Sequence, residues 1–172
     1  MNRFVLWVAE GFGIGRIPVM PGTFGSFVGF GWLGLLLCTG TLWVVYVGIL
    51  VGFVLSVWLC GLAERILQKK DPGSIVLDEI TAFPICFLPW IVKFWSLHHS
   101  LPGLSAFFAK GTWYATAGIF VAFRVFDVLK PWPIRASQSF AGGWGVTIDD
   151  FLAGGYVLLL VWAGSLFGLS IR

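Results

Sequence analysis

Five carboxylates stand at the edges of apolar stretches, where an acidic side chain needs a physical reason. They are Asp78, Glu79, Asp127, Asp149 and Asp150. An unpaired ionised carboxylate in an apolar setting is so unfavourable that such groups normally pair with cations or hold a metal ion. Oxygen ligands without His or Cys favour Mg²⁺, which also keeps waters and phosphate oxygens. All five are therefore predicted to be catalytic and metal-ligating residues of a Mg²⁺ site, with room for a second ion or a general base.

Helix capping is the alternative explanation for the paired acids. Asp78-Glu79 and Asp149-Asp150 each precede an apolar segment, and acids stabilise the start of a helix. Asp127 does not fit this alternative, because it follows an apolar segment, where a negative charge opposes the helix dipole. The metal site is the interpretation that covers all five residues.

Cations accompany Asp127 at short spacing. Arg124, Asp127 and Lys130 are three residues apart, so they share one face if the helix continues to Lys130. The prolines of residues 131–133 then stop it, and Arg135 follows. This pattern is either an ion-pair ladder or a metal ligand flanked by phosphate-binding arms, because the planar Arg fork matches phosphate oxygens. Spacing alone leaves both open.

The elements that position these residues are predicted from composition. The chain has 172 residues, of which 58% are hydrophobic and 11% charged, and its mean hydropathy is +0.92. Soluble proteins carry roughly a quarter charged residues, so an integral membrane protein with one domain spanning residues 1–172 is expected. The net charge of +3 is too small to indicate nucleic-acid binding. Three cysteines without metal-ligand spacing and two adjacent histidines make a zinc site improbable.

Five apolar segments define the expected fold. They are residues 24–38, 41–62, 80–95, 111–126 and 151–171. A full membrane span needs about 20 apolar residues, so some of these are short, and Pro84 and Pro89 are expected to kink the third. The predicted fold class is all-α, a polytopic membrane helical bundle of about five embedded helices with active-site loops at the cytoplasmic face.

Charge distribution predicts the orientation of this bundle. If all five segments cross, residues 1–23, 63–79 and 127–150 lie on one side. Counted with Arg124, that side holds eight of the eleven basic residues and all eight acids. The positive-inside rule places it in the cytoplasm. The expected location is therefore a bacterial inner membrane, with the site facing the cytoplasm.

Five motifs follow one another along the chain: residues 11–13 (GFG), 21–26 (PGTFGS), 71–79 (DPGSIVLDE), 123–135 (FRVFDVLKPWPIR) and 142–150 (GGWGVTIDD). In this order they resemble the phosphatidylglycerophosphatase A family. The resemblance covers nearly the whole chain. This chain departs from the family at Pro72, where His is common, and at Thr147, where Met is usual, so no role of that His carries over.

The resemblance implies a Mg²⁺-dependent lipid phosphatase that converts phosphatidylglycerophosphate to phosphatidylglycerol. Its partners would be this phospholipid and the bilayer. The residues expected to bind the substrate phosphate are Arg124, Lys130, Arg135, Thr23 and Ser74. Lipid phosphatases that use a nucleophilic His are excluded, because both histidines fall on the opposite side. A membrane carrier that binds a cation through its carboxylates is the alternative, although it would distribute acids through the membrane depth.

Overall fold

The computed structural model describes residues 2–166, and these residues form helices and turns without a strand. The helices, in chain order, are α1 (Asn2–Ala9), η1 (Gly11–Arg16), α2 (Pro21–Leu37), α3 (Leu42–Leu67), α4 (Leu77–Ala82), η2 (Phe83–Phe87), α5 (Leu88–His98), η3 (Leu104–Phe108), α6 (Trp113–Leu129), α7 (Ile134–Ser137) and α8 (Gly143–Leu166). The predicted all-α class is confirmed. The single-domain prediction and the fifth apolar segment extend into residue 1 and residues 167–172, which lie outside the described residues.

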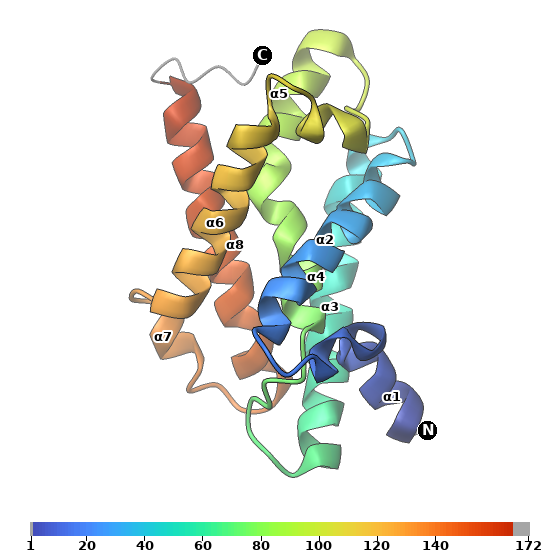
Figure 1. The fold of residues 1–172 in the computed structure, drawn as a ribbon, viewed down its shortest axis with the longest axis vertical. Helices are drawn as coiled ribbons and strands as arrows, with labels where there is room; N and C mark the ends of the chain where they lie inside the picture. Colours follow the sequence, from blue (N-terminus) through green and yellow to red (C-terminus); the bar gives the residue numbers. More distant parts are fainter. Residues whose placement is uncertain (1, 167–172) are drawn as a thin grey trace.

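Three helical stretches are long and apolar enough to cross a membrane, namely Leu42–Leu67, Leu77–His98 and Gly143–Ser165. Helices α2 and α6 are shorter, at 17 residues each. Figure 1 shows α2, α3, α4–α5, α6 and α8 running in alternate directions along the long axis. The membrane helical bundle is confirmed, and three of its passes have the length of a full span.

The predicted kink in the third segment has a clear structural form. The stretch from Leu77 to His98 is α-helical at both ends but passes through the 3₁₀ turn η2, with Pro84 near its start and Pro89 just beyond it. Proline lacks the backbone N–H that continues an α-helix. This broken stretch is the middle of the bundle, because α4 and η2 both pack against α2 and α8.

Aromatic side chains fill the core around η2. Phe83 and Phe87 are fully buried, and Phe83 makes edge-to-face contacts with Phe30 of α2 and Phe123 of α6. Such pairs contribute about 0.5–1.5 kcal/mol beyond their buried area. The packing fixes the relative positions of α2, α4 and α6, the helices that carry half of the candidate site residues.

Helix α8 begins earlier than the apolar pattern predicts. Its first residue is Gly143, where a Cβ atom would lie 1.8 Å from the backbone oxygen of Val57 in α3. Glycine therefore lets the two helices meet at this point, and α8 starts there. The expectation that Asp149 and Asp150 precede the helix is wrong, because both lie inside it.

The charged ends of the helices gather at one end of the bundle. Figure 1 shows α1, the end of α3, the start of α4, α7 and the start of α8 together at the lower end, whereas the α2–α3 turn and the loop before α6 lie at the upper end. The candidate site is built at the lower end.

Candidate active site

Carboxylates from three helices and one loop line a single pocket of about 260 Å³. The acids lining it are Asp71 from the loop before α4, Asp78 and Glu79 from α4, Asp127 from α6, and Asp149 and Asp150 from α8. The structure thus brings together all five predicted acids and adds Asp71. Asp78 and Asp150 are only 5% and 4% exposed, whereas Asp71 is exposed, so the pocket holds the five predicted acids largely out of water.

Arg124 ties two of these acids together. Its Nη1 lies 2.7 Å from Asp127 Oδ2 and 3.4 Å from Glu79 Oε1. The same nitrogen is 3.5 Å from the hydroxyl of Ser26 in α2. One guanidinium therefore links α2, α4 and α6, and the ion pair with Asp127 has the three-residue spacing that the sequence predicts.

Lys130 makes the second cationic contact. It ends α6 in a left-handed conformation, which places Nζ in a short hydrogen bond to Asp149 Oδ2 and 3.9 Å from Asp127 Oδ1. Burial alone would lower the pKa of this ammonium, but the hydrogen bond to Asp149 and the nearby carboxylates outweigh it and raise the pKa to about 12. Lys130 is therefore a fixed positive charge at neutral pH.

Two glycines in the first turns of α2 allow Glu79 to approach the helix backbone. A Cβ atom at Gly22 would lie 1.9 Å from Glu79 Oε1, and one at Gly25 would lie 2.9 Å from Glu79 Oε2. The carboxylate thus sits at the N-terminal end of α2, where the helix dipole favours negative charge. This contact gives the two glycines of the motif at residues 21–26 a specific role in the site.

Several buried polar atoms in this region have no hydrogen-bond partner among residues 2–166. They are Glu79 Oε2, Arg124 Nε and the hydroxyl of Thr23. Buried polar groups are normally satisfied by protein, water or a ligand. Asp78 and Asp150 likewise form no ion pair within residues 2–166. The site therefore retains capacity to bind a polar ligand or an ion.

The donor set fits a magnesium ion in chemistry but is not a preformed cage. Residues 2–166 contain no group of three or more acidic, His or Cys side chains close enough to hold a metal ion by themselves. Mg²⁺ commonly binds through one or two carboxylates and completes its shell with water and phosphate oxygens. Asp78 and Asp150 are acids of this kind without a cation partner, so the residues fit such an ion.

The helix-start alternative fits one of the two acidic pairs. Asp78 and Glu79 lie in the first turn of α4, where the helix dipole favours negative charge, although the residue before α4 is Val76 and no side-chain cap forms there. Asp149 and Asp150 lie more than one turn inside α8. The Asp78 side chain does accept a hydrogen bond from the Glu79 backbone, at 3.1 Å, but this bond lies within the acidic pair.

Four of the five predicted phosphate-binding residues lie outside the pocket lining, and Lys130 is the one that lines it. Thr23 is next to Gly22, close to Glu79. The backbone of Ser74 packs against Gly15 of η1. Arg135 is exposed on α7, with no ion pair described in residues 2–166. Arg124 and Lys130 are the predicted cations that the fold brings to the acids, while the phosphate-binding roles of all five residues stay predictions.

Sequence reasoning missed three contributors to the site. Asp71 lines the pocket and its backbone N–H donates to Glu64, Gln138 Nε2 donates to Asp149 Oδ2 at 3.1 Å, and Ser26 accepts from Arg124. Asp71 and Ser26 belong to recognised motifs, which was a usable signal, whereas nothing in the sequence singles out Gln138.

The two departures from the family pattern lie beside this centre. The Thr147 hydroxyl is buried and lies 3.1 Å from that of Ser56 in α3, so its polar group is satisfied. Pro72 is buried and does not line the pocket. Neither substitution removes a group from the carboxylate pocket.

The fold and the pocket together define a polytopic membrane protein with a carboxylate-lined site at one end of its helical bundle. The sequence model of the family described as phosphatidylglycerophosphatase A matches residues 7–165. The chain belongs to the phosphatidylglycerophosphatase A family, as the motif resemblance predicts. The prediction that it is an enzyme of the phosphatase class is confirmed by this membership.

Curated relatives agree with this assignment. The chain is 34% identical to phosphatidylglycerophosphatase A of Escherichia coli, over 86% of this chain and 75% of the relative. It is 33% identical to phosphatidylglycerophosphatase A of Haemophilus influenzae, over 91% of this chain and 85% of the relative. A putative phosphatidylinositol-3-phosphatase of Bacteroides thetaiotaomicron is 30% identical, over 90% and 89% respectively. No solved structure matches the chain at a significant level.

Proposed function

We propose that this chain is a Mg²⁺-dependent phosphatase that hydrolyses phosphatidylglycerophosphate to phosphatidylglycerol and phosphate. The observation that carries the proposal is the carboxylate pocket at one end of a membrane bundle, where Lys130 lines the pocket and Arg124 pairs with two of its acids. Two relatives are named for this lipid phosphatase. A phosphomonoester on a lipid headgroup would reach such an end of the bundle without leaving the bilayer.

Charge supports the requirement for a metal ion. Six carboxylates line the pocket, and Arg124 and Lys130 supply two positive charges. If all the acids are ionised, four negative charges are in excess, and a phosphomonoester brings about two more. Protons or bound cations must offset this excess, and Mg²⁺ is the ion that carboxylate and phosphate oxygens prefer together.

The proposed division of labour follows from existing contacts. Asp78 and Asp150, which lack a cation partner, would hold Mg²⁺, and the ion would neutralise charge on the transferred phosphoryl group. Arg124 and Lys130 are anchored by Asp127 and Asp149, so their remaining donors would orient the phosphoryl oxygens. A carboxylate of the pocket would accept the proton of the attacking water.

The substrate requires a direct comparison, because one relative is named as a phosphatidylinositol phosphatase. Purified protein in detergent should release phosphate faster from phosphatidylglycerophosphate than from phosphatidylinositol 3-phosphate at equal surface concentration. Activity should disappear with EDTA and return with added Mg²⁺. Preference for the inositol lipid would reject the proposed substrate, and full activity in EDTA would reject the proposed metal.

A matched pair of variants tests the pocket itself. Asp150→Asn should abolish Mg²⁺-dependent turnover with the thermal transition nearly unchanged, whereas Glu10→Gln removes a buried acid outside the pocket and should retain turnover. If Asp150 served only to stabilise the helix, its loss would cost about 1 kcal/mol of stability with near-normal activity. Normal rates for Asp150→Asn at saturating Mg²⁺ would reject the metal role.

Orientation is part of the same proposal. The end of the bundle that carries the pocket also carries most basic residues, and basic loops are retained in the cytoplasm. The pocket would therefore face the cytoplasm from a bacterial inner membrane. A cation carrier has no comparable support, because the acids that line the pocket gather at one end instead of along the bundle.

A further inference from the structure

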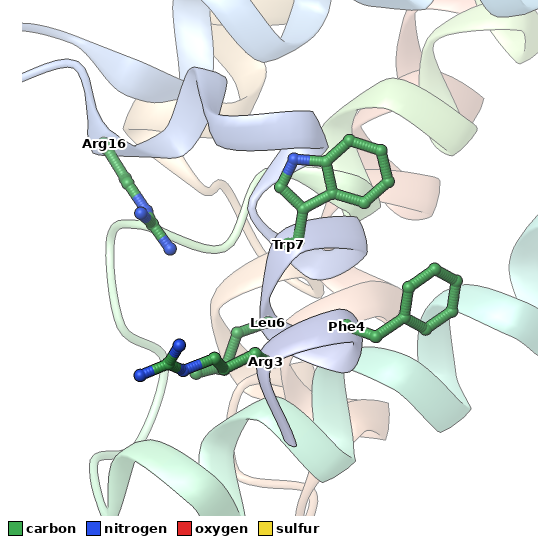
Figure 2. Close-up of a pocket in the computed structure, with 5 residues that line it drawn as sticks. All are labelled: Arg3, Phe4, Leu6, Trp7 and Arg16. Carbon is green, nitrogen blue, oxygen red and sulfur yellow. The ribbon is translucent and has the colours of Figure 1, made fainter. Parts of the chain in front are cut away.

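A second pocket, of about 510 Å³, lies on the N-terminal helix, apart from the carboxylate pocket. It is lined by Arg3, Phe4, Leu6, Trp7 and Arg16 and contains no acid in its lining. Figure 2 shows the Arg3 and Arg16 side chains on one side of α1 and the rings of Phe4 and Trp7 on the other. The pocket therefore combines two guanidinium groups with an aromatic surface.

Packing places α1 against the last turns of α3, a candidate membrane span. Ala9 of α1 is fully buried in a cluster with Cys60 and Ala63 of α3. Because the outer face of α1 is then turned away from the bundle, Phe4 and Trp7 remain 66% and 46% exposed. A short helix beside the end of a span lies at the level of the lipid headgroups, where Trp and Arg side chains are favoured.

The two arginines retain hydrogen-bonding capacity toward an anion. The ion pair of Arg16 uses its Nε, 2.7 Å from Glu10 Oε2, while its side chain remains 66% exposed. Arg3 is exposed and has no ion pair described in residues 2–166. Guanidinium groups bind phosphate oxygens in a bidentate geometry, and the volume suits one headgroup.

We propose that the α1 pocket binds an anionic phospholipid of the bilayer, with its phosphate at Arg3 and Arg16 and its upper acyl chain against Phe4 and Trp7. Two aromatic pairs extend the apolar surface toward η1. The ring centroids of Phe4 and Trp7 are 6.3 Å apart, and those of Trp7 and Phe12 are 4.8 Å apart. The bound lipid is distinct from the substrate in the carboxylate pocket. The site holds whether or not that pocket has the proposed activity.

Lipid binding to detergent-solubilised full-length protein tests the site. Native mass spectrometry would measure the affinity for the first bound dioleoylphosphatidylserine, an anionic lipid without a phosphomonoester, with dioleoylphosphatidylcholine as the neutral comparison. Each basic residue near a membrane surface contributes about 1 kcal/mol, or about fivefold in affinity. Arg3→Gln should weaken phosphatidylserine binding about fivefold, and Arg3→Gln/Arg16→Gln about 25-fold, with little change for phosphatidylcholine. In the double variant the Gln amide can still donate to Glu10.

The matched control removes the same charge elsewhere. Lys69 and Lys70 are exposed beyond the end of α3 and line neither pocket, so Lys69→Gln/Lys70→Gln should bind phosphatidylserine within about twofold of wild type. If this control lost as much phosphatidylserine affinity as Arg3→Gln/Arg16→Gln, binding would depend on net charge alone and the α1 site would be rejected. Wild-type affinity in Arg3→Gln, which removes an exposed charge that has no ion pair within residues 2–166, would also overturn it. If glycerophosphoserine, which lacks acyl chains, bound as tightly as dioleoylphosphatidylserine, the proposal that a bilayer lipid occupies the pocket would be rejected.

Discussion

Gly22→Ala should disable the site by adding one methyl group. The new Cβ would lie 1.9 Å from Glu79 Oε1 and 3.1 Å from Arg124 Nη1. An ordinary contact begins near 3.4 Å, so the carboxylate must withdraw by about 1.5 Å. That movement is enough to separate Glu79 from Arg124, now 3.4 Å apart. Displacements of about 1 Å commonly reduce rates 10²-fold, so kcat/KM for lipid phosphate release should fall by roughly that factor.

Gly31→Ala provides the control in the same helix. A Cβ atom at Gly31 meets nothing within 4 Å, so alanine should retain full activity and stabilise α2 by up to about 1 kcal/mol through its higher helix propensity. Gly22→Ala should gain less stability, because the Glu79 carboxylate must move away from Arg124 to make room for the methyl group. Phosphate release and thermal unfolding in detergent measure both effects. Activity of Gly22→Ala within twofold of Gly31→Ala would refute the proposed contact between α2 and Glu79.

Three further outcomes are expected. Arg124→Ala should lower kcat/KM by roughly 10²-fold or more, while Arg135→Ala, which removes an exposed side chain outside the pocket lining, should have a much smaller effect. If the activity of Arg124→Ala recovered fully at high Mg²⁺, the role of Arg124 would be to neutralise the carboxylates and not to bind the substrate phosphate. Because the pKa of Lys130 is raised from 10.5 to about 12, its stabilising ion pair is fully present below pH 10.5 and is lost only as pH rises through about 12. The difference in thermal stability between wild type and Lys130→Met should therefore stay constant from pH 7 to 10, and a decline across that range would contradict the raised value. The orientation can be tested with single cysteines in a protein whose exposed native cysteine, Cys38, has been replaced. Ser139→Cys should react with a membrane-impermeant maleimide added from the cytoplasmic side, and Ser100→Cys with the reagent added from the opposite side. The reverse pattern would reject the orientation.

Local patterns in the sequence were sufficient for the fold class and for part of the site. Long apolar segments with few charges predict membrane helices, because hydrocarbon excludes unpaired polar groups. The three-residue spacing of Arg124 and Asp127 predicts an ion pair on one helical face, and their 2.7 Å contact confirms it. Helix α6 ends at Leu129, so Lys130 approaches Asp127 from a left-handed residue beyond the helix and not from the predicted helical face. Pro84 and Pro89 predict the interruption seen at η2. Each of these features depends on neighbours within a turn or two.

Long-range pairing was decided by the tertiary structure alone. Lys130 meets Asp149 across 19 residues, and Arg124 meets Glu79 across 45. Sequence places all these residues at one end of the bundle but does not assign partners, because the choice depends on how α4, α6 and α8 pack around the aromatic core. The same packing brings Gln138 to Asp149 and leaves Arg135 exposed.

The start of α8 and the role of the glycines also required the packed structure. Apolarity alone places the last helix after Asp150, whereas close contact with α3 at Gly143 moves its start upstream and carries both acids into the helix. Gly22 precedes the apolar segment predicted at residues 24–38 and Gly25 lies at its start, but α2 already begins at Pro21, and Glu79 occupies the space that the two missing side chains leave. Composition and spacing therefore determined which residues could form a site, and helix packing determined which of them meet, because side-chain contacts between distant segments exist only once the helices are in place.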